Sequence, residues 1–140
     1  MSLHIVAVYH NTESRFFEYE DGQQLRQVIS HWRQWPTGTD PLQIADWAWH
    51  VFNLDLDALE SDRGMPEGEA DFLIAAAYRL MRHRSLSVGD VVSVTTEDIV
   101  TWLACDNNGW RQITAPAATT GAPLTAEAVH RHARGGDGDQ

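Results

Sequence analysis

Apolar residues in the first forty positions follow two different patterns. Residues 3–9 are apolar on both sides of an extended chain, which predicts a strand near the centre of a sheet. A turn at residues 11–14 follows, and residues 15–19 are expected to return as the hairpin partner of this strand. In residues 23–35 the apolar positions recur at the i, i+3, i+4 and i+7 spacing of one helix face, which predicts a helix; they are Leu25, Val28, Ile29 and Trp32.

Two more helices are predicted in the middle of the chain. Residues 42–52 follow Asp40, a good helix cap, and Pro41, which suits the first helical position. This helix is apolar around most of its circumference, so we expect it to be buried or to offer a second face to a partner. Residues 67–82 begin with acidic side chains and end with arginines, the arrangement that the helix dipole favours.

Short strands are expected after the last of these helices. Residues 87–90, Ser-Val-Gly-Asp, have the composition of a turn, and a β-branched run follows at residues 91–95. Residues 99–104 and 110–114 have the pattern of two more strands, separated by the loop signal Asp-Asn-Asn-Gly. Residues 88–114 are therefore predicted to form a three-stranded antiparallel meander.

Together these elements predict a single α+β domain over residues 1–114. The N-terminal β-hairpin and the C-terminal meander are expected to form one sheet, with two or three helices on one of its faces. Residues 115–123 have the proline, glycine and small residues of a linker. Residues 125–134 are expected to form a short helix, and residues 135–140 a flexible tail.

Composition restricts the class of protein. The chain has 140 residues, which suits one domain, and its single cysteine, Cys105, cannot form an internal disulfide. No stretch has the pattern of a secretory signal or a membrane span, so a cytoplasmic protein is expected. The net charge is −10, from 20 acidic residues against 10 basic residues that are all arginines. Such a charge argues against nucleic acid as a partner.

One motif stands out in the second half of the chain: Ser85-Leu-Ser-Val-Gly-Asp-Val-Val92, followed by Cys105-Asp-Asn-Asn-Gly-Trp110. This pair of segments resembles a module in uncharacterised small proteins of actinobacterial plasmids and mobile elements, and it is similar to the YodL-like domain. The resemblance covers residues 45–114, and it implies a fold module and a genomic setting but no catalytic residue. Because turn chemistry alone accounts for them, a structural role is expected for the motif residues Ser85, Ser87, Gly89, Asp90, Gly109 and Trp110.

Six tryptophans are many for a chain of this length. Each indole can bury about 150–250 Å², so most are expected in the core and one or two at an interface. The apolar helix 42–52 and its surroundings supply a candidate interaction surface, made of Trp35, Trp47, Trp49 and Phe52. Its expected occupant is a protein partner or a second copy of the chain.

Candidate catalytic and metal-binding groups give weak signals. Asp55-Leu-Asp57 suggests a calcium loop, but positions 59 and 60 carry Leu and Glu where an EF-hand needs an oxygen ligand and a glycine. The seven histidines show no metal-binding spacing, and a nucleophilic Cys105 would need a base that the sequence does not reveal. We therefore assign no catalytic, cofactor-binding or metal-binding residue.

Three functions remain open at this point. The favoured one is a non-catalytic interaction or accessory protein, because of the tryptophan content and the apolar helix 42–52. The acidic charge also allows a nucleic-acid mimic that regulates a DNA-processing enzyme, which would need carboxylates on one face at phosphate-like spacing. A small-ligand binder or an enzyme would need a pocket that gathers a histidine or Cys105 with a carboxylate.

Overall fold

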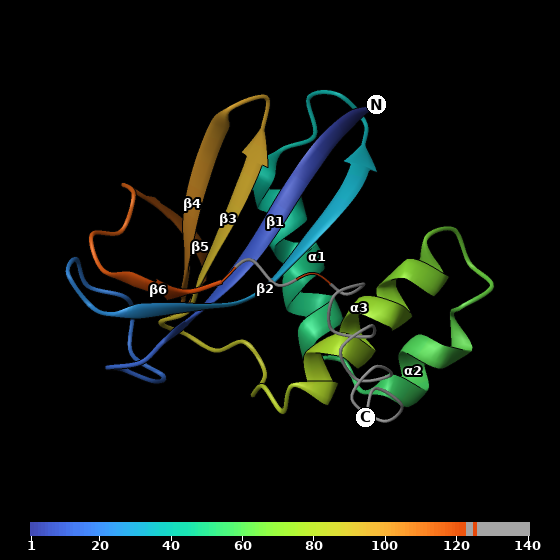
Figure 1. Cartoon of the computed structure of the whole chain (residues 1–140), viewed down its shortest axis with the longest axis horizontal. Coiled ribbons are helices and arrows are strands. Elements are labelled where there is room, and N and C mark those ends of the chain that lie inside the picture. Colours follow the sequence, from blue (N-terminus) through green and yellow to red (C-terminus); the bar gives the residue numbers. More distant parts are fainter. Residues whose placement is uncertain (123–124, 126–140) are drawn as a thin grey trace, which may run out of the picture.

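The computed structural model describes residues 1–122 and Thr125, which form a six-stranded sheet with three helices beside it (Figure 1). The strands are β1 (Ser2–Asn11), β2 (Leu25–Trp35), β3 (Val91–Thr96), β4 (Ile99–Asp106), β5 (Gly109–Ile113) and β6 (Thr119–Gly121). The helices are α1 (Pro41–Asn53), α2 (Leu56–Ser61) and α3 (Gly68–Leu80). The strand order is β5-β4-β3-β1-β2-β6, and all neighbours are antiparallel except β2 and β6.

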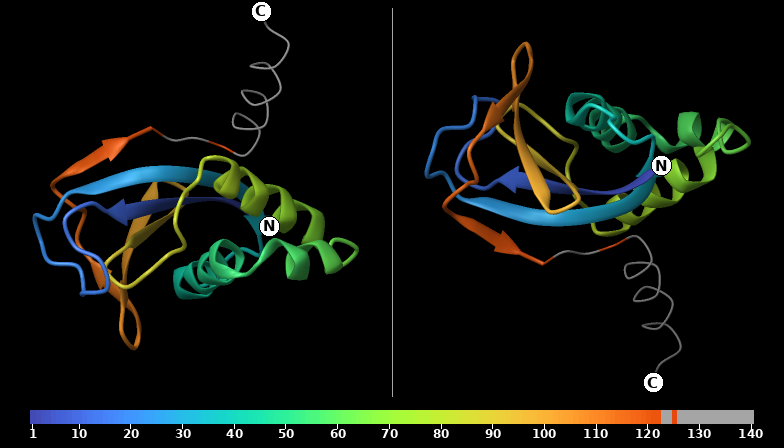
Figure 2. Two further views of the ribbon diagram at one scale, coloured as in Figure 1. Left: turned by 90° about the horizontal axis from the view of Figure 1, so that it is seen from below. Right: turned by 90° about the horizontal axis from the view of Figure 1, so that it is seen from above.

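Hydrophobic cores lie on both faces of this sheet. The larger core joins Val6 of β1 and Val94 of β3 to the buried sides of α1 and α3, and the helices group together beside the curved β1 and β2 (Figure 2). The smaller core contains Tyr9 of β1 and Leu25 of β2, together with Tyr19 from the loop of residues 12–24. That loop therefore covers part of the face that the helices leave open.

The helix predicted over residues 23–35 is wrong, because these residues form the long strand β2. Ten residues of β2 pair with β1, from Leu25 opposite Asn11 to Trp35 opposite Ser2. Val28, Ile29 and Ser30 are buried at consecutive positions, so both faces of the strand are covered there. A strand that is buried on both faces does not alternate apolar and polar residues. In β2 the remaining spacing of the apolar residues coincided with the period of a helix.

The predicted sheet is also wrong in its pairing. Residues 15–19 form no strand, and β1 pairs with β2 and with β3 instead. Strands β3, β4 and β5 are consecutive antiparallel neighbours as the predicted meander required, with β5 at one edge of the sheet, but a further strand, β6, follows them in the chain. Residues 119–121, predicted as linker, form β6 and pair in parallel with residues 25–27 of β2, and Thr125 forms a bridge to Ser30. The helix and tail expected after Thr125 lie outside the described residues.

The helices predicted over residues 42–52 and 67–82 are confirmed as α1 and α3, with slightly different ends. Asp40 caps α1 as expected, since its carboxylate accepts a hydrogen bond from the backbone N–H of Leu42 at 3.0 Å. The acidic stretch between them contains the short helix α2, which Asp55 caps through the N–H of Ala58. Side-chain caps therefore mark the starts of α1 and α2, whereas the residue before α3, Glu67, makes no capping hydrogen bond.

The loop of residues 12–24 is fixed to the turn that precedes β3. The N–H of Phe16 donates to the carbonyl of Val88 at 3.1 Å. Gly89 has a φ of 100°, and a Cβ atom added to it would lie 2.5 Å from the carbonyl oxygen of Phe17. Only glycine combines this left-handed backbone with so close an approach of a second backbone segment.

We expect Gly89→Ala to destabilise the protein more than the matched variant Gly22→Ala. Gly22 has a similar φ of 89°, but a Cβ there meets no atom within 4 Å. The left-handed conformation costs about 1–2 kcal/mol in either variant, and the steric clash adds about 1–3 kcal/mol at Gly89 alone. Urea denaturation of both variants checks this, and equal losses of unfolding free energy would contradict it.

Candidate functional site

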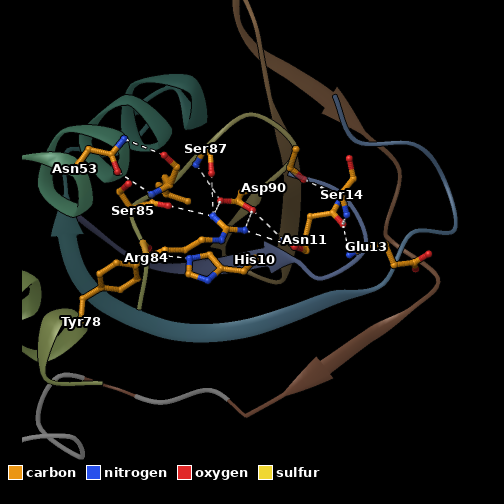
Figure 3. A network of polar contacts seen from close by, with 12 residues as sticks. His10, Asn11, Glu13, Ser14, Asn53, Tyr78, Arg84, Ser85, Ser87 and Asp90 are labelled. Atoms are coloured by element: carbon orange, nitrogen blue, oxygen red, sulfur yellow. Dashed lines mark hydrogen bonds and ion pairs between the residues drawn. The ribbon is translucent and has the colours of Figure 1, made fainter. Parts of the chain in front are cut away.

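A buried ion pair lies at the centre of the Ser85–Val92 motif (Figure 3). The side chain of Asp90 is 0% exposed, and Arg84 grips it with both terminal nitrogens, at 2.6 Å and 2.7 Å. The backbone N–H groups of Asn11 and Ser87 each donate to the same carboxylate at 2.9 Å. Four donors therefore satisfy the buried charge, which would otherwise be costly to remove from water.

Asn11 extends this network into the loop of residues 12–24. Its side-chain oxygen accepts hydrogen bonds from the backbone N–H groups of Glu13 and Ser14, both at 2.9 Å. Its amide nitrogen donates to the carbonyl of Gly89 at 3.2 Å and to the side chain of Gln23 at 2.8 Å. Both ends of the loop are thus bonded to one residue beside Asp90.

The predicted motif residues contribute to this network in different ways. The hydroxyl of Ser87 accepts a hydrogen bond from Arg84 at 2.9 Å, whereas Ser85 is exposed and offers Arg84 only its carbonyl. Asn53 of α1 exchanges two hydrogen bonds with the backbone of Leu86, which ties the helix to the motif. These contacts support the structural role expected for Ser87, Gly89 and Asp90.

A histidine and a tyrosine adjoin the ion pair. The Nε2 atom of His10 lies 2.6 Å from the Tyr78 hydroxyl, which donates its own hydrogen to the carbonyl of Arg84 (Figure 3). His10 must therefore carry its proton on Nε2. Burial lowers the pKa of His10 to about 4; Asp90 opposes this shift, and the positive charges of Arg84, His83 and Arg26 add to it. Burial likewise raises the pKa of Tyr78 and lowers that of His83.

Three of the four residues in the predicted interaction surface pack inside the fold, so the prediction that all four form one exposed surface is corrected. Phe52 is buried, and Trp35 and Trp47 are half-buried around the guanidinium of Arg33, which lies 5.3 Å and 4.8 Å from their ring centroids. Arg33 pairs with Asp71 of α3 at 2.7 Å, and Trp47 donates to the same carboxylate at 3.0 Å. These rings therefore join β2 to α1 and α3.

Trp49 is the exposed member of the predicted surface, at 40%, and it borders a cavity of about 320 Å³. The cavity lies where α1 meets the loop between β4 and β5, and Trp110 of the motif lines it too. The indole nitrogen of Trp110 donates to Asp46 at 3.0 Å, and Asp46 stands one helical turn before Trp49. We call this the tryptophan cavity.

Cys105 lines the tryptophan cavity together with Asp106. This is the combination of a cysteine and a carboxylate that sequence reasoning required of an enzyme. Burial, together with the negative charges of Asp90 and Asp106, raises the pKa of the Cys105 thiol to about 12. Because the thiolate is the reactive form, a thiol that keeps its proton at neutral pH is a poor nucleophile.

Two phenylalanines in the loop of residues 12–24 are the most exposed aromatic rings of the described chain. Phe16 is 63% exposed and Phe17 74% exposed, and we call this pair the phenylalanine tip. Both rings border a hollow of about 560 Å³, and Asn107 lines this hollow as well as the tryptophan cavity. The tip and the cavity therefore lie side by side.

Sequence reasoning missed the phenylalanine tip and Arg84. Residues 15–19 have the pattern of a strand, and successive side chains of a strand point to opposite faces. One of the two phenylalanines was therefore expected to face water, and this expected exposure was the signal in the sequence that could have indicated a binding surface. Arg84 lies just beyond the arginine-rich end of the predicted helix 67–82, and nothing local indicated that it would fold back onto Asp90.

Other apolar side chains are exposed elsewhere, both on strands and on or beside the helices. Those on strands are Leu3 of β1, Trp32 of β2 and Ile99 and Val100 of β4, and those on or beside the helices are Leu42, Met65, Leu73, Leu80 and Met81. Among the described residues, no group of three or more histidine, cysteine or acidic side chains is placed to hold a metal ion. Within the same part of the chain, no helix has the length and apolarity to cross a membrane.

Comparison of the chain with protein-family models, curated proteins and solved structures gives no match. The resemblance to plasmid-encoded proteins and to the YodL-like domain therefore stays a hypothesis that rests on the motif.

Removing the buried carboxylate should destabilise the protein strongly. We expect Asp90→Ala to cost about 3–5 kcal/mol of unfolding free energy, because Arg84 and two backbone N–H groups lose their acceptor. Glu69→Ala is the matched control, since it breaks the ion pair between Glu69 and Arg63, which is exposed. Chemical denaturation should show little change for the control, and similar losses in both variants would contradict the assignment.

His10 should make stability depend on pH between about pH 4 and pH 6.5. Its pKa is about 4 in the folded protein and 6.5 in the unfolded chain, so the unfolded chain binds more protons in this window. Stability is therefore lost as pH falls, by up to about 3 kcal/mol. Urea denaturation at several pH values should show a weaker dependence for His10→Gln, whereas the exposed control His50→Gln should retain it. A wild-type slope in His10→Gln would refute the interpretation.

Proposed function

We propose that this protein is a non-catalytic interaction module that docks onto a partner protein through the phenylalanine tip. The observation that carries the proposal is the exposure of Phe16 and Phe17, 63% and 74%, in a loop whose backbone is fixed. Adjacent exposed aromatic rings are typical of protein interfaces, where aromatic residues are enriched.

The exposure of these rings is built into the fold. Phe16 has a φ of 73°, a conformation that is unfavourable for a bulky residue, and its N–H is bonded to Val88. The side chain of Asn11 holds the backbone of Glu13 and Ser14 just before it. Strain that the surrounding structure maintains is characteristic of functional positions. The rings are therefore presented in a prepared conformation.

Preorganisation of the loop backbone favours binding of a partner. Burying a phenylalanine side chain contributes about 1.5–3 kcal/mol, and little of this gain is lost when the backbone is already ordered. The two rings together contribute about 3–6 kcal/mol, which is comparable to the lower end of the association cost of about 4–15 kcal/mol, so the rim of the interface has to add to the affinity.

Charge indicates the chemistry of the partner. The loop of residues 12–24 carries four acidic residues and one arginine, Arg15, whose guanidinium lies 4.7 Å from the centroid of the Phe16 ring. An acidic border around two apolar rings complements an apolar cleft edged with lysine or arginine. We therefore infer that the partner is a protein surface of this kind.

The two alternative functions are less well supported by the contacts. A nucleic-acid mimic needs free carboxylates at phosphate-like spacing on one face, and five of the 17 acidic residues in the described part of the chain are instead paired with arginines: Glu67, Glu69, Asp71, Asp90 and Asp106. An enzyme with a cysteine nucleophile would need a thiolate, and the thiol of Cys105 retains its proton. A setting in mobile elements remains the hypothesis that the motif resemblance implies.

A displayed peptide library selected against the protein tests the proposal. We expect the selected peptides to combine apolar residues with lysine or arginine, and to lose at least tenfold in affinity for the double variant Phe16→Ser/Phe17→Ser, since about 1.4 kcal/mol corresponds to tenfold. Ile99→Ser is the matched control, because Ile99 is 69% exposed on another part of the surface.

Both variants should keep the wild-type circular dichroism spectrum and thermal midpoint. Peptides that bind the double variant as tightly as the wild type would overturn the proposal. Light scattering addresses a second copy as the partner: a dimer that dissociates only in the double variant would replace a foreign partner with a copy of the chain.

A further inference from the structure

We propose that the tryptophan cavity binds one arginine side chain of the docked partner and so recognises a guanidinium group next to the phenylalanine tip. This inference deepens the proposed function and rests on it. It assigns to Trp49, Trp110 and Asp46 the task of selecting a cationic side chain.

Size and position suit a single side chain. The volume of about 320 Å³ is at the lower end of the range of about 300–1,000 Å³ for pockets that hold small molecules. The cavity shares Asn107 with the hollow under the phenylalanine tip, so a peptide segment on the tip lies beside its opening. One long side chain can then enter while the rest of the segment stays on the surface.

The negative charge of the residues that line the cavity favours a cationic side chain. Asp46 and Asp106 line the cavity, and none of its lining residues is an arginine or a histidine. Asp106 is bonded to Arg111 through Oδ2, at 2.8 Å, but its buried Oδ1 accepts no hydrogen bond within the described part of the chain. A buried carboxylate oxygen without a donor is unfavourable, so a group with N–H donors is stabilised next to it. Anionic and purely apolar side chains gain nothing comparable.

The two indoles favour arginine over lysine. Trp49 is exposed into the cavity region, and the hydrogen bond from Trp110 to Asp46 fixes the second ring beside a carboxylate. A planar guanidinium stacks on indole faces, carries five N–H donors and is more weakly hydrated than an ammonium group. It can therefore contact a ring and a carboxylate at the same time.

Nuclear magnetic resonance with three short peptides tests the inference. The probes are acetyl-Ala-Arg-Ala-amide, the same peptide with lysine, and the same peptide with citrulline, which keeps the shape of arginine but has no charge. We expect the arginine peptide to shift the indole N–H signals of Trp49 and Trp110 saturably, the lysine peptide to bind at least threefold more weakly, and the citrulline peptide to cause no saturable shift.

Two variants locate the binding. Asp46→Asn retains an oxygen that accepts the hydrogen bond from Trp110, so the ring stays in place while the charge is lost; we expect at least a tenfold loss of affinity for the arginine peptide. Trp49→Ala should abolish the shifts at Trp110, whereas the control Trp32→Ala removes a tryptophan that is 59% exposed on β2 and should leave binding unchanged. Equal binding of the citrulline and arginine peptides, or full affinity in Asp46→Asn, overturns the inference.

Failure of this inference can be told apart from failure of the proposed function. If library peptides lose affinity for Phe16→Ser/Phe17→Ser but not for Trp49→Ala, the phenylalanine tip binds a partner and the cavity inference is wrong. If the arginine peptide binds the cavity while the double variant retains every library peptide, the cavity recognises a guanidinium and the docking role of the tip is wrong.

Discussion

The buried carboxylate of Asp90 is the constraint on which the site depends. A charge with no contact to water must find its donors within the protein, and here they come from Arg84, Ser87 and the end of β1. Meeting that requirement fixes the segment after α3, the turn before β3 and the beginning of the loop of residues 12–24. Because ion pairs of this kind often add little net stability, the main effect of the pair is to select one arrangement of these three segments.

That arrangement explains why the loop can hold its rings in water. The backbone N–H of Asn11 donates to the carboxylate of Asp90, and the Asn11 side-chain oxygen in turn accepts hydrogen bonds from the backbone N–H groups of Glu13 and Ser14. Gly89 lets the carbonyl of Phe17 approach closely on the other side. In the same loop the ring of Tyr19 packs into the smaller core, whereas the rings of Phe16 and Phe17 stay exposed. The polar network therefore determines where an apolar surface is displayed.

Local signals in the sequence were enough for part of this structure. Asp40 and Pro41 located the start of α1, and the β-branched run and the Asp-Asn-Asn-Gly loop located β3, β4 and β5. Strand β2 could not be predicted, because its coverage on both faces depends on the loop and helices that surround it. For the same reason the roles of the tryptophans could not be predicted from the sequence. The rings of Trp35 and Trp47 pack around the guanidinium of Arg33, whereas Trp49 and Trp110 line a cavity. The Ser-Val-Gly-Asp turn was recognised, but its arginine partner lies outside any local pattern.

The short strand β6 has a consequence for behaviour at high concentration. Without it, the eleven residues of β2 would form an outer border of the sheet with a full row of unsatisfied backbone groups. Such a border is a template on which other chains add strands, and the process ends in fibrous aggregates. By pairing with residues 25–27, and through the bridge of Thr125 to Ser30, the chain shields part of that border with its own backbone. A few residues of low sequence complexity thereby help to keep the molecule from associating with itself in an uncontrolled way.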